Sequence, residues 1–416
     1  MNVDHTTHPR VALFGQFGTG NFGNDASLLA AVGALRAYDP DVAILCLCYE
    51  PESVTKRYGL PATPIRSYSA DRGSRPRTKF RRLARRFSDA IRMYRLMRKI
   101  DVVAVPGSGL FEAGRHRPGS VASLLFTTAL TARLAGTKFA VVSVGADFAE
   151  LRSTRALLRW TLRLATYRSF RDDHSRRSAV GFGAPCDSDP VYPDLVFGLG
   201  NPARSIARNE PKSVGVGVLA YHGPFSFDKP AKRERMAAAY VDSLTSFVEW
   251  LLGRGLTVTL FGGDLKDEKV AEVILDRVRT ASPEALVDIS HAESFYDTLE
   301  IVHQVDYVVA TRFHNIVAAV MTGTPAISLS YRAKNDELLD DLGLERFHQP
   351  LDELDDERLR KQFLDLQRSA EEVAHRMVAK YPIYRDQVAV QWSEFVSAAS
   401  PKAKVGNLAD TRRRLQ

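Results

Sequence analysis

The sequence predicts an α/β protein with two doubly wound domains, each built on a parallel β-sheet between layers of helices. Short apolar, β-branched runs alternate with helical patterns along the whole chain, which is typical of such sheets. This alternation restarts near residue 212, after a stretch with glycine, proline and asparagine. The chain has 416 residues, of which 45% are hydrophobic and 25% charged, so it is long enough for two globular domains.

The predicted strands are the runs in which β-branched and apolar residues cluster. They cover residues 11–14, 42–48, 101–105 and 139–145 in the first half, and 213–219, 256–262, 306–310 and 325–330 in the second. We expect Rossmann-like domains at 1–205 and 206–383, followed by a C-terminal helix and flexible tail at 384–416, of which the helix returns to the first domain. Ligands of such sheets bind beyond the carboxyl ends of the strands, so we expect the two domains to face a cleft.

The amino-terminal sequence and the cysteines indicate a cytoplasmic protein. The start, MNVDHTTHPR, lacks the apolar segment of a signal peptide, and charged residues interrupt the longest apolar runs. Cys46, Cys48 and Cys186 are too few for a disulfide framework. We interpret them as buried thiols in a reducing compartment, with a metal site as the alternative.

The formal charge of +8 is concentrated in one segment. Between residues 66 and 99 a series of arginines and lysines is opposed by only Asp71 and Asp89, while apolar residues recur there at helical spacing. We expect an amphipathic helix at 79–99 that contacts an anionic membrane from the cytoplasmic side, or that is simply a solvated helix of its own domain. Nucleic acid is not expected as a partner, because the aromatic and glycine pattern of an RNA-binding module is missing.

A glycine-rich loop follows the first strand. Gly18, Gly20 and Gly23 would let backbone N–H groups approach an anion at a helix N-terminus, and Asn24 or Asp25 could cap that helix. The spacing does not suit a nicotinamide nucleotide, because Gln16 and Phe17 separate the strand from the first of these glycines. A turn that only needs glycine is the alternative.

Two further loops of the first half carry polar groups after predicted strands. Gly107, Ser108 and Gly109 form a tight strand-to-helix loop that would suit a ligand or solvent equally well. Farther along, Asp172 could be a base, but an N-cap for the helix that carries Ser175 is the simpler interpretation.

The segment ATRFHNIVAAVMTGTP places Arg312 and His314 where an apolar strand meets an apolar helix. An arginine can bind a carboxylate or phosphate through two N–H groups, and a histidine can move a proton near neutral pH. Both residues stand at a helix N-terminus, which favours an anion. Lys334 follows nearby as another cation. The alternative is a surface arginine and a capping histidine.

These segments together resemble the polysaccharide pyruvyl transferase family. The resemblance rests on GNFGNDA with Asn21, on PGSGLF, on RDDHS followed by PDL, and most specifically on TRFHNIVAAVMTGTPAISLSYRAK. The family often carries an arginine after the first strand of its second domain, where this chain has Tyr221 and His222.

The resemblance implies a fold similar to that of GT-B glycosyltransferases, with the acceptor on the first domain and the donor on the second. It implies transfer of the enolpyruvyl group of phosphoenolpyruvate, as co-substrate, onto two hydroxyls of a sugar as a ketal. Arg312 and His314 would be the donor-site pair, with Lys334 and His222 nearby, and Asp25 or Asp172 would be the base. No other cofactor and no metal are expected.

We therefore expect a transferase that acts on a cell-envelope polysaccharide or a lipid-linked oligosaccharide. One alternative is a GT-B glycosyltransferase with a nucleotide-sugar donor, and another is a glycan-binding protein without catalysis. Nothing in the sequence indicates an oligomeric state.

Overall fold

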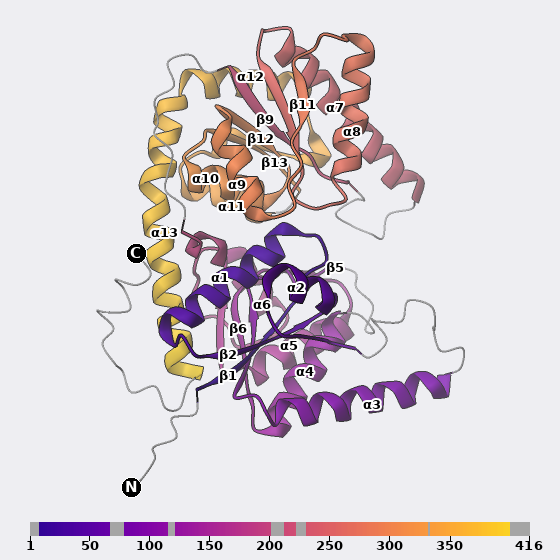
Figure 1. The fold of residues 1–416 in the computed structure, drawn as a ribbon, viewed down its shortest axis with the longest axis vertical. Coiled ribbons are helices and arrows are strands. Elements are labelled where there is room, and N and C mark those ends of the chain that lie inside the picture. Colours follow the sequence, from indigo (N-terminus) through magenta and orange to yellow (C-terminus); the bar gives the residue numbers. More distant parts are fainter. Residues whose placement is uncertain are drawn as a thin grey trace. The chain divides into compact units, whose positions relative to one another are not determined.

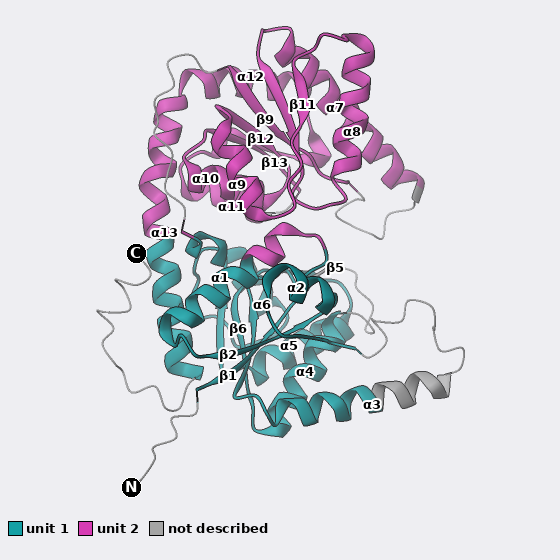
Figure 2. Ribbon diagram, viewed as in Figure 1, with its two compact units in different colours: residues 1–19, 27–199, 385–416 teal, residues 20–26, 200–384 magenta. Residues whose placement is uncertain are grey.

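The structure, a computed structural model, describes residues 8–66, 79–114, 121–200, 212–221, 230–331 and 333–399. It divides into two compact units (Figure 2). Unit 1 comprises residues 1–19, 27–199 and 385–416, and unit 2 comprises residues 20–26 and 200–384. The glycine loop is therefore split: Gly18 belongs to unit 1, whereas the residues from Gly20 to Ala26 pack with unit 2.

Unit 1 is built on a parallel six-stranded sheet in the order β3-β2-β1-β4-β6-β8 (Figure 1). Its strands are β1 (Arg10–Phe14), β2 (Ala43–Cys48), β3 (Ala62–Pro64), β4 (Val102–Pro106), β6 (Lys138–Val144) and β8 (Tyr167–Phe170). A separate pair, β5 (Phe111–Gly114) and β7 (Ala146–Ala149), extends two of its loops. Its helices are α1 (Phe22–Tyr38), α2 (Pro51–Tyr58), α3 (Lys79–Met97), α4 (Val121–Ala135), α5 (Arg152–Leu164), α6 (Asp173–Gly181) and the short η1 (Leu195–Gly198).

The order of these strands determines where the helices pack. Right-handed crossovers between parallel strands place α1 and α2 on one face of the sheet and α3, α4 and α5 on the other. Helices α3 and α4 are in contact, as are α4 and α5. Their apolar sides cover a continuous core, in which Phe14, Phe139 and Phe170 are at most 1% exposed.

Unit 2 repeats this topology with the strand order β11-β10-β9-β12-β13-β14. Its strands are β9 (Ser213–Gly217), β10 (Thr257–Phe261), β11 (Val287–Ile289), β12 (Tyr307–Ala310), β13 (Ala326–Ser330) and β14 (His348–Pro350). Its helices are α7 (Pro230–Leu252), α8 (Glu268–Ala281), α9 (Phe295–Gln304), α10 (Phe313–Thr322), α11 (Ala333–Asp341), α12 (Asp356–Arg368) and α13 (Ala370–Ala399), with η2 (Glu345–Phe347) and η3 (Leu351–Glu353).

Helix α13 contributes to both units. Its residues up to Tyr384 belong to unit 2, where the Tyr384 hydroxyl donates to Asp341 at 2.6 Å. From Arg385 onward it packs in unit 1, where Trp392 and Phe395 are 1% exposed. Gln391 there donates to the hydroxyl of Ser169 on β8 at 2.8 Å.

The eight strands expected from the sequence are all confirmed, and the two parallel sheets confirm the fold class. The cysteines are buried and none forms a disulfide, as expected. Helix α3 is present, but the side chains that would form its basic face, Arg81, Arg82, Arg85 and Arg86, lie outside the described residues. In the described part of the chain, no helix combines the length and the apolar composition that crossing a membrane requires.

Candidate functional site

The turn between β12 and α10 holds the two residues that the sequence singled out. Strand β12 and nearly all of α10 are buried, so both elements are fixed by packing. Arg312 is the N-cap residue of α10 and has extended backbone, with φ of −78° and ψ of 134°. His314 lies in the first turn of the helix. Both residues therefore stand at the N-terminus of α10, as predicted.

The Arg312 guanidinium is already bonded to a carboxylate of its own unit. Its Nη2 donates to Asp267 at 2.7 Å, its Nε donates to the other oxygen of Asp267, and Asp264 lies 3.7 Å from Nη2. Burial alone would lower the pKa of Arg312, but the bonds to Asp267 raise that pKa above its usual range. The bidentate hydrogen bonding that the sequence suggested for a ligand is thus made with Asp267. Among the described residues Nη1 has no hydrogen-bond partner, so this nitrogen can donate to a ligand.

Asp267 accepts hydrogen bonds from three loops of unit 2. It is 0% exposed, and besides Arg312 it accepts from the backbone N–H of Ala220 at 2.7 Å and of Gly263 at 3.0 Å. These partners follow β9, β10 and β12, which are neighbours in the sheet. One carboxylate therefore fastens the carboxyl-terminal loops of three adjacent strands.

His314 packs against the second half of the glycine loop. An added Cβ at Gly23 would overlap the His314 ring and lie 2.5 Å from its Cγ, so the ring occupies the space that a side chain at residue 23 would fill. The rings of Phe313 and Phe295 flank His314 edge-on, with centroids 5.2 and 6.3 Å away. Glycine at residue 23 thus allows the His314 imidazole to pack directly against the backbone.

The backbone holds the glycine loop in place. Phe22 N–H donates to the carbonyl of Gly263 at 3.2 Å, and Leu265 N–H donates to the carbonyl of Gly20 at 3.0 Å. The amide of Asn21 also donates to Asp264 at 3.3 Å. These bonds join residues 20–26 to the loop after β10.

The helix after the glycine loop starts earlier than the sequence suggested. Asn21 caps α1, because its side-chain oxygen accepts from the backbone of Asn24 at 3.1 Å; the expectation that Asn24 or Asp25 is the cap is wrong. Asp25 is 3% exposed in the first turn. Gly18 and Gly20 have positive φ values of 75° and 88°, which glycine adopts readily.

Lys334 lies on the same side of unit 2 as Arg312. Its ammonium nitrogen stands 5.0 Å from the centroid of the Phe313 ring. Tyr221, which takes the place of the family's arginine, is 6% exposed and packs against Tyr240. His222 lies outside the described residues. The structure thus brings together Arg312, His314 and Lys334 around Phe313.

Asn315 is a further polar residue at this helix end. It is 0% exposed, and neither atom of its side-chain amide has a hydrogen-bond partner among the described residues. The amide fills the space beside Gly217 and Gly263, where an added Cβ would lie 2.7 and 2.8 Å from its nitrogen and oxygen. Glycines at two strand ends therefore leave room for one asparagine.

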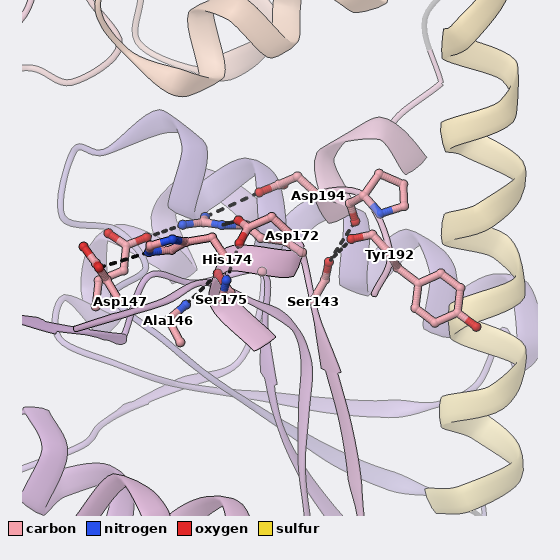
Figure 3. A network of polar contacts seen from close by, with 12 residues as sticks. Ser143, Ala146, Asp147, Asp172, His174, Ser175, Tyr192 and Asp194 are labelled. Atoms are coloured by element: carbon pink, nitrogen blue, oxygen red, sulfur yellow. Dashed lines mark hydrogen bonds and ion pairs between the residues drawn. The ribbon is translucent and has the colours of Figure 1, made fainter. Parts of the chain in front are cut away.

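Unit 1 carries a second polar network, centred on Arg171 at the end of β8 (Figure 3). The Arg171 side chain is 3% exposed and is ion-paired with Glu112, with Asp172 at 3.4 Å and with Asp194 at 3.6 Å. Three carboxylates thus surround one guanidinium, at the carboxyl edge of the sheet. A carboxylate has about four lone-pair sites, so each of these can accept hydrogen bonds in addition to those that it already accepts.

The residues around this network keep its geometry fixed. Asp172 is the N-cap of α6, because it accepts from the backbone of Ser175 at 2.6 Å, which confirms the capping interpretation. His174 lies 3.1 Å from Asp147 and is about one-third exposed. Figure 3 shows the pair at the margin of the network, with Ser143 bonded to the backbone of residue 193 on the other side.

The loop after β4 adjoins the same network. Gly107 has a positive φ of 49°, and its carbonyl accepts from Ser27 at 3.1 Å. Ser108 is 3% exposed, and its hydroxyl has no partner among the described residues. An added Cβ at Gly109 would lie 2.9 Å from the Glu112 carboxylate. The sequence had grouped these residues with Asp172, and the structure places all of them in unit 1.

The sequence did not single out Asp267, Asp264, Arg171 or Asn315 as site residues. The two aspartates had a signal, since they follow the apolar strand β10 directly in the segment GGDLKD. A separate group of three potential metal ligands, His8, Asp39 and Asp41, lies on the surface of unit 1. It shares no residue with either network.

One family model, described as polysaccharide pyruvyl transferase, matches residues 21–332. The chain belongs to the polysaccharide pyruvyl transferase family. It is therefore a transferase. Arg312, Asp267 and the Arg171 network fall within the matched region, whereas Lys334 lies just beyond its end. No curated protein sequence matches the chain significantly.

This pyruvyl transferase shares its fold with solved GT-B structures. It is similar to UDP-GlcNAc 2-epimerase from Neisseria meningitidis bound to UDP-GlcNAc, with a TM-score of 0.59 and 11% identity over 94% of this chain and 99% of that one. It is similar to Anabaena HepE in complex with UDP-glucose, with a TM-score of 0.57 and 12% identity over 94% and 100% of the two chains. A lipopolysaccharide outer core galactosyltransferase, WaaB, has a TM-score of 0.53 and 10% identity over 94% and 99%. At these identities the likeness concerns the fold alone.

Proposed function

We propose that this pyruvyl transferase uses phosphoenolpyruvate to form a cyclic pyruvyl ketal on two hydroxyls of a cell-envelope sugar. The observation that carries the proposal is the group formed by Arg312, His314 and Lys334 at the N-terminus of α10. It offers an N–H donor, a proton-transfer group and a cation to one small anionic ligand.

The charges in unit 2 assign different roles to the two cations. Arg312 is paired with Asp267, and Asp264 lies 3.7 Å away, so the arginine supplies a directed N–H donor but no net positive charge. Lys334 lies against Phe313 and supplies the cation that attracts the carboxylate and phosphate of the donor. The N-terminus of α10 adds its dipole.

The chemistry needs one proton donor and one positioned nucleophile. A proton from His314 to the methylene carbon of phosphoenolpyruvate leaves an oxocarbenium-like carbon, which one sugar hydroxyl attacks. Loss of inorganic phosphate and attack by the second hydroxyl then close the ketal. One hydroxyl proton restores His314 and the other leaves with the phosphate, so the reaction consumes no other reagent.

Unit 1 is our candidate for binding the acceptor. Glu112 and Asp172 hold Arg171 and are 14% and 10% exposed at their side chains, and His174 with Asp147 is more open. Carboxylates accept hydrogen bonds from sugar hydroxyls, and each carboxylate has several lone pairs, so one that already has a partner can accept a further bond. The base that takes the hydroxyl proton stays open between Asp25 and Asp172.

The test is to incubate the protein with phosphoenolpyruvate and a panel of lipid-linked oligosaccharides while inorganic phosphate is measured. Acceptor-dependent phosphate release and a mass gain of one pyruvyl ketal on the sugar support the proposal. Release of a nucleoside diphosphate from a nucleotide sugar, without use of phosphoenolpyruvate, would instead identify a glycosyltransferase. No turnover of either donor would leave the glycan-binding alternative.

We also propose that unit 1 docks on an anionic membrane through the helices on one face of its sheet. Helices α3, α4 and α5 contain many arginines and a single acid, Asp89. On α5, Trp160 is 47% exposed, and the guanidinium carbons of Arg159 and Arg163 lie 5.8 and 5.3 Å from its ring centroid. An exposed tryptophan between arginines suits the boundary between lipid headgroups and acyl chains.

Vesicle co-sedimentation tests this docking. Phosphatidylcholine vesicles with added phosphatidylglycerol should bind the protein, and neutral vesicles should not. Replacing Arg159 and Arg163 by glutamine should weaken binding by about fivefold for each charge, since each contributes about 1 kcal/mol near such a surface. The matched control replaces Arg277 and Arg279, which lie on α8 of unit 2 and are about half exposed. Equal weakening by both pairs, or equal binding to both vesicles, would contradict the docking.

A further inference from the structure

Asp267 and Arg312 form an ion pair at the centre of the donor-site loops. Among the described residues, the Asp267 carboxylate accepts hydrogen bonds from N–H donors alone: two from Arg312, one from Ala220 and one from Gly263. The carboxylate is 0% exposed, so water cannot replace any of these donors. Its position is therefore fixed from several directions.

This arrangement constrains the arginine far more than a surface ion pair would. Both Nε and Nη2 are committed to Asp267, so the plane of the guanidinium is set by a carboxylate that is itself tied to two strand ends. Gly263 adds steric confinement, because a Cβ there would lie 2.8 Å from the Arg312 side chain. Of the three guanidinium nitrogens, Nη1 is the one without a partner in the described part of the chain, and it can donate to a ligand.

We propose that Asp267 is a positioning residue for pyruvyl transfer, and that it aims Arg312 Nη1 at the donor while cancelling the arginine's net charge. The proposal rests on the proposed use of phosphoenolpyruvate. Arg312 then contributes direction, and Lys334 contributes charge. A positioned but locally neutral donor discriminates by geometry, and it leaves the product phosphate less tightly held than an arginine without a carboxylate partner would.

The same pair couples the donor site to the glycine loop. Asp264, 3.7 Å from Arg312, accepts from Asn21, and Gly263 accepts from Phe22. A shift of Asp267 would move the Gly263 backbone, and with it the loop that packs against His314. Asp267 therefore affects both the N–H donor and the proton-transfer group, without touching the substrate.

The experiment compares Asp267→Asn with a matched control, Asp306→Asn. Asp306 is 6% exposed and also accepts several hydrogen bonds, from Lys212 N–H and from the N–H and hydroxyl of Ser213, but it lies at the amino ends of β9 and β12. Asp267 accepts at both oxygens, so asparagine at residue 267 turns an N–H₂ group toward donors, whereas these bonds to Asp306 all go to one oxygen, Oδ2, which an amide oxygen can replace. The melting temperature should therefore fall more in Asp267→Asn than in Asp306→Asn. Only Asp267→Asn should lower kcat/KM for phosphoenolpyruvate, on the order of 10–100-fold, the range known for partners that orient a functional side chain.

A double-variant cycle separates positioning from general loss of structure. On an Arg312→Met background, Asp267→Asn should cause a smaller fold-loss of kcat/KM than in the parent, because the part that acts through the arginine is already lost and only the effect through the glycine loop remains. Equal losses of kcat/KM in the two single variants, or the same fold-loss on both backgrounds, would overturn the proposal.

An NMR signal can test, without any enzymatic reaction, whether Asp267 fixes the Arg312 side chain. In protein labelled with ¹⁵N-arginine, the Arg312 Nε–H should give a slowly exchanging signal that Asp267→Asn abolishes and Asp306→Asn retains. If the parent does not consume phosphoenolpyruvate, the proposed function fails, and this signal still decides whether Asp267 fixes Arg312. Persistence of the signal in Asp267→Asn would refute the positioning role.

Discussion

Gly23→Ala should disable His314 while leaving the fold nearly intact. Residue 23 lies in the first turn of α1, where alanine is the better helix former by about 1 kcal/mol, and its φ is not in the left-handed region. The backbone therefore accepts the substitution. Its whole effect should come from the added methyl group and the imidazole that now occupies its place.

The size of the effect follows from the overlap. The farthest of three His314 ring atoms would lie 2.5 Å from the new Cβ, whereas ordinary contact begins near 3.4 Å. The ring must therefore move by about 1 Å or more, and a displacement of that size costs on the order of 100-fold in rate when it misplaces a reacting group. The ring cannot move freely, since Phe295 and Phe313 flank it.

The assay measures phosphate release from phosphoenolpyruvate by the parent, by Gly23→Ala and by His314→Ala, with Gly33→Ala as the control. Gly33 is exposed on the same helix, and an added Cβ there meets nothing within 4 Å. The control should keep full activity and gain about 1 kcal/mol of stability. The argument is refuted if Gly23→Ala keeps the activity of the control, or if it loses activity only because it unfolds.

Two further outcomes are expected. Lys334→Gln should raise KM for phosphoenolpyruvate on the order of tenfold or more, and this rise in KM should shrink at high salt, because a positive charge is lost. The effect of Arg312→Gln on KM should depend less on salt, since the charge of Arg312 is already balanced by Asp267. Equal salt dependence of the two variants would contradict the assigned roles. Burial raises the pKa of the Cys46 and Cys186 thiols to about 12, so the reactive thiolate is scarce well below that pH. Alkylation near pH 8 should therefore be slow in the folded protein and fast after denaturation, and rapid labelling of the native chain would show that the thiols are not buried as described.

The sequence predicted the central strands because their composition and burial agree. Strands such as β4 and β12 are wholly buried on both faces of a parallel sheet, and this requires unbroken apolar runs. Strand β8 escaped prediction because Arg168 and Ser169 interrupt it, each for a reason of its own: Arg168 is paired with Asp189, and Ser169 is bonded to Gln391. Partners 21 and 222 residues away cannot be inferred from a local pattern.

The candidate site was predictable where a residue's role depends on its own element, and not where it depends on a distant partner. Arg312 and His314 stand at a strand-to-helix junction, which the sequence marks by the change from apolar to polar residues. The hydrogen bonds between Arg312 and Asp267 depend on how the loops after β10 and β12 pack, because the two residues are 45 positions apart in the sequence. The chemistry of arginine suggested that Arg312 binds a ligand through two N–H groups, but in the structure these two groups donate to Asp267.

The two units are interleaved along the chain, and this limits how the protein can be cut and recombined. Unit 1 includes the end of α13, and unit 2 includes the start of α1. A fragment that ends at residue 199 would lack Trp392 and Phe395 of its own core, and a fragment that starts at residue 200 would lack the glycine that His314 packs against. Chimeras that test the proposed roles, acceptor binding by unit 1 and donor binding by unit 2, should therefore transplant residues 27–199 together with 385–399, and should leave residues 20–26 with unit 2.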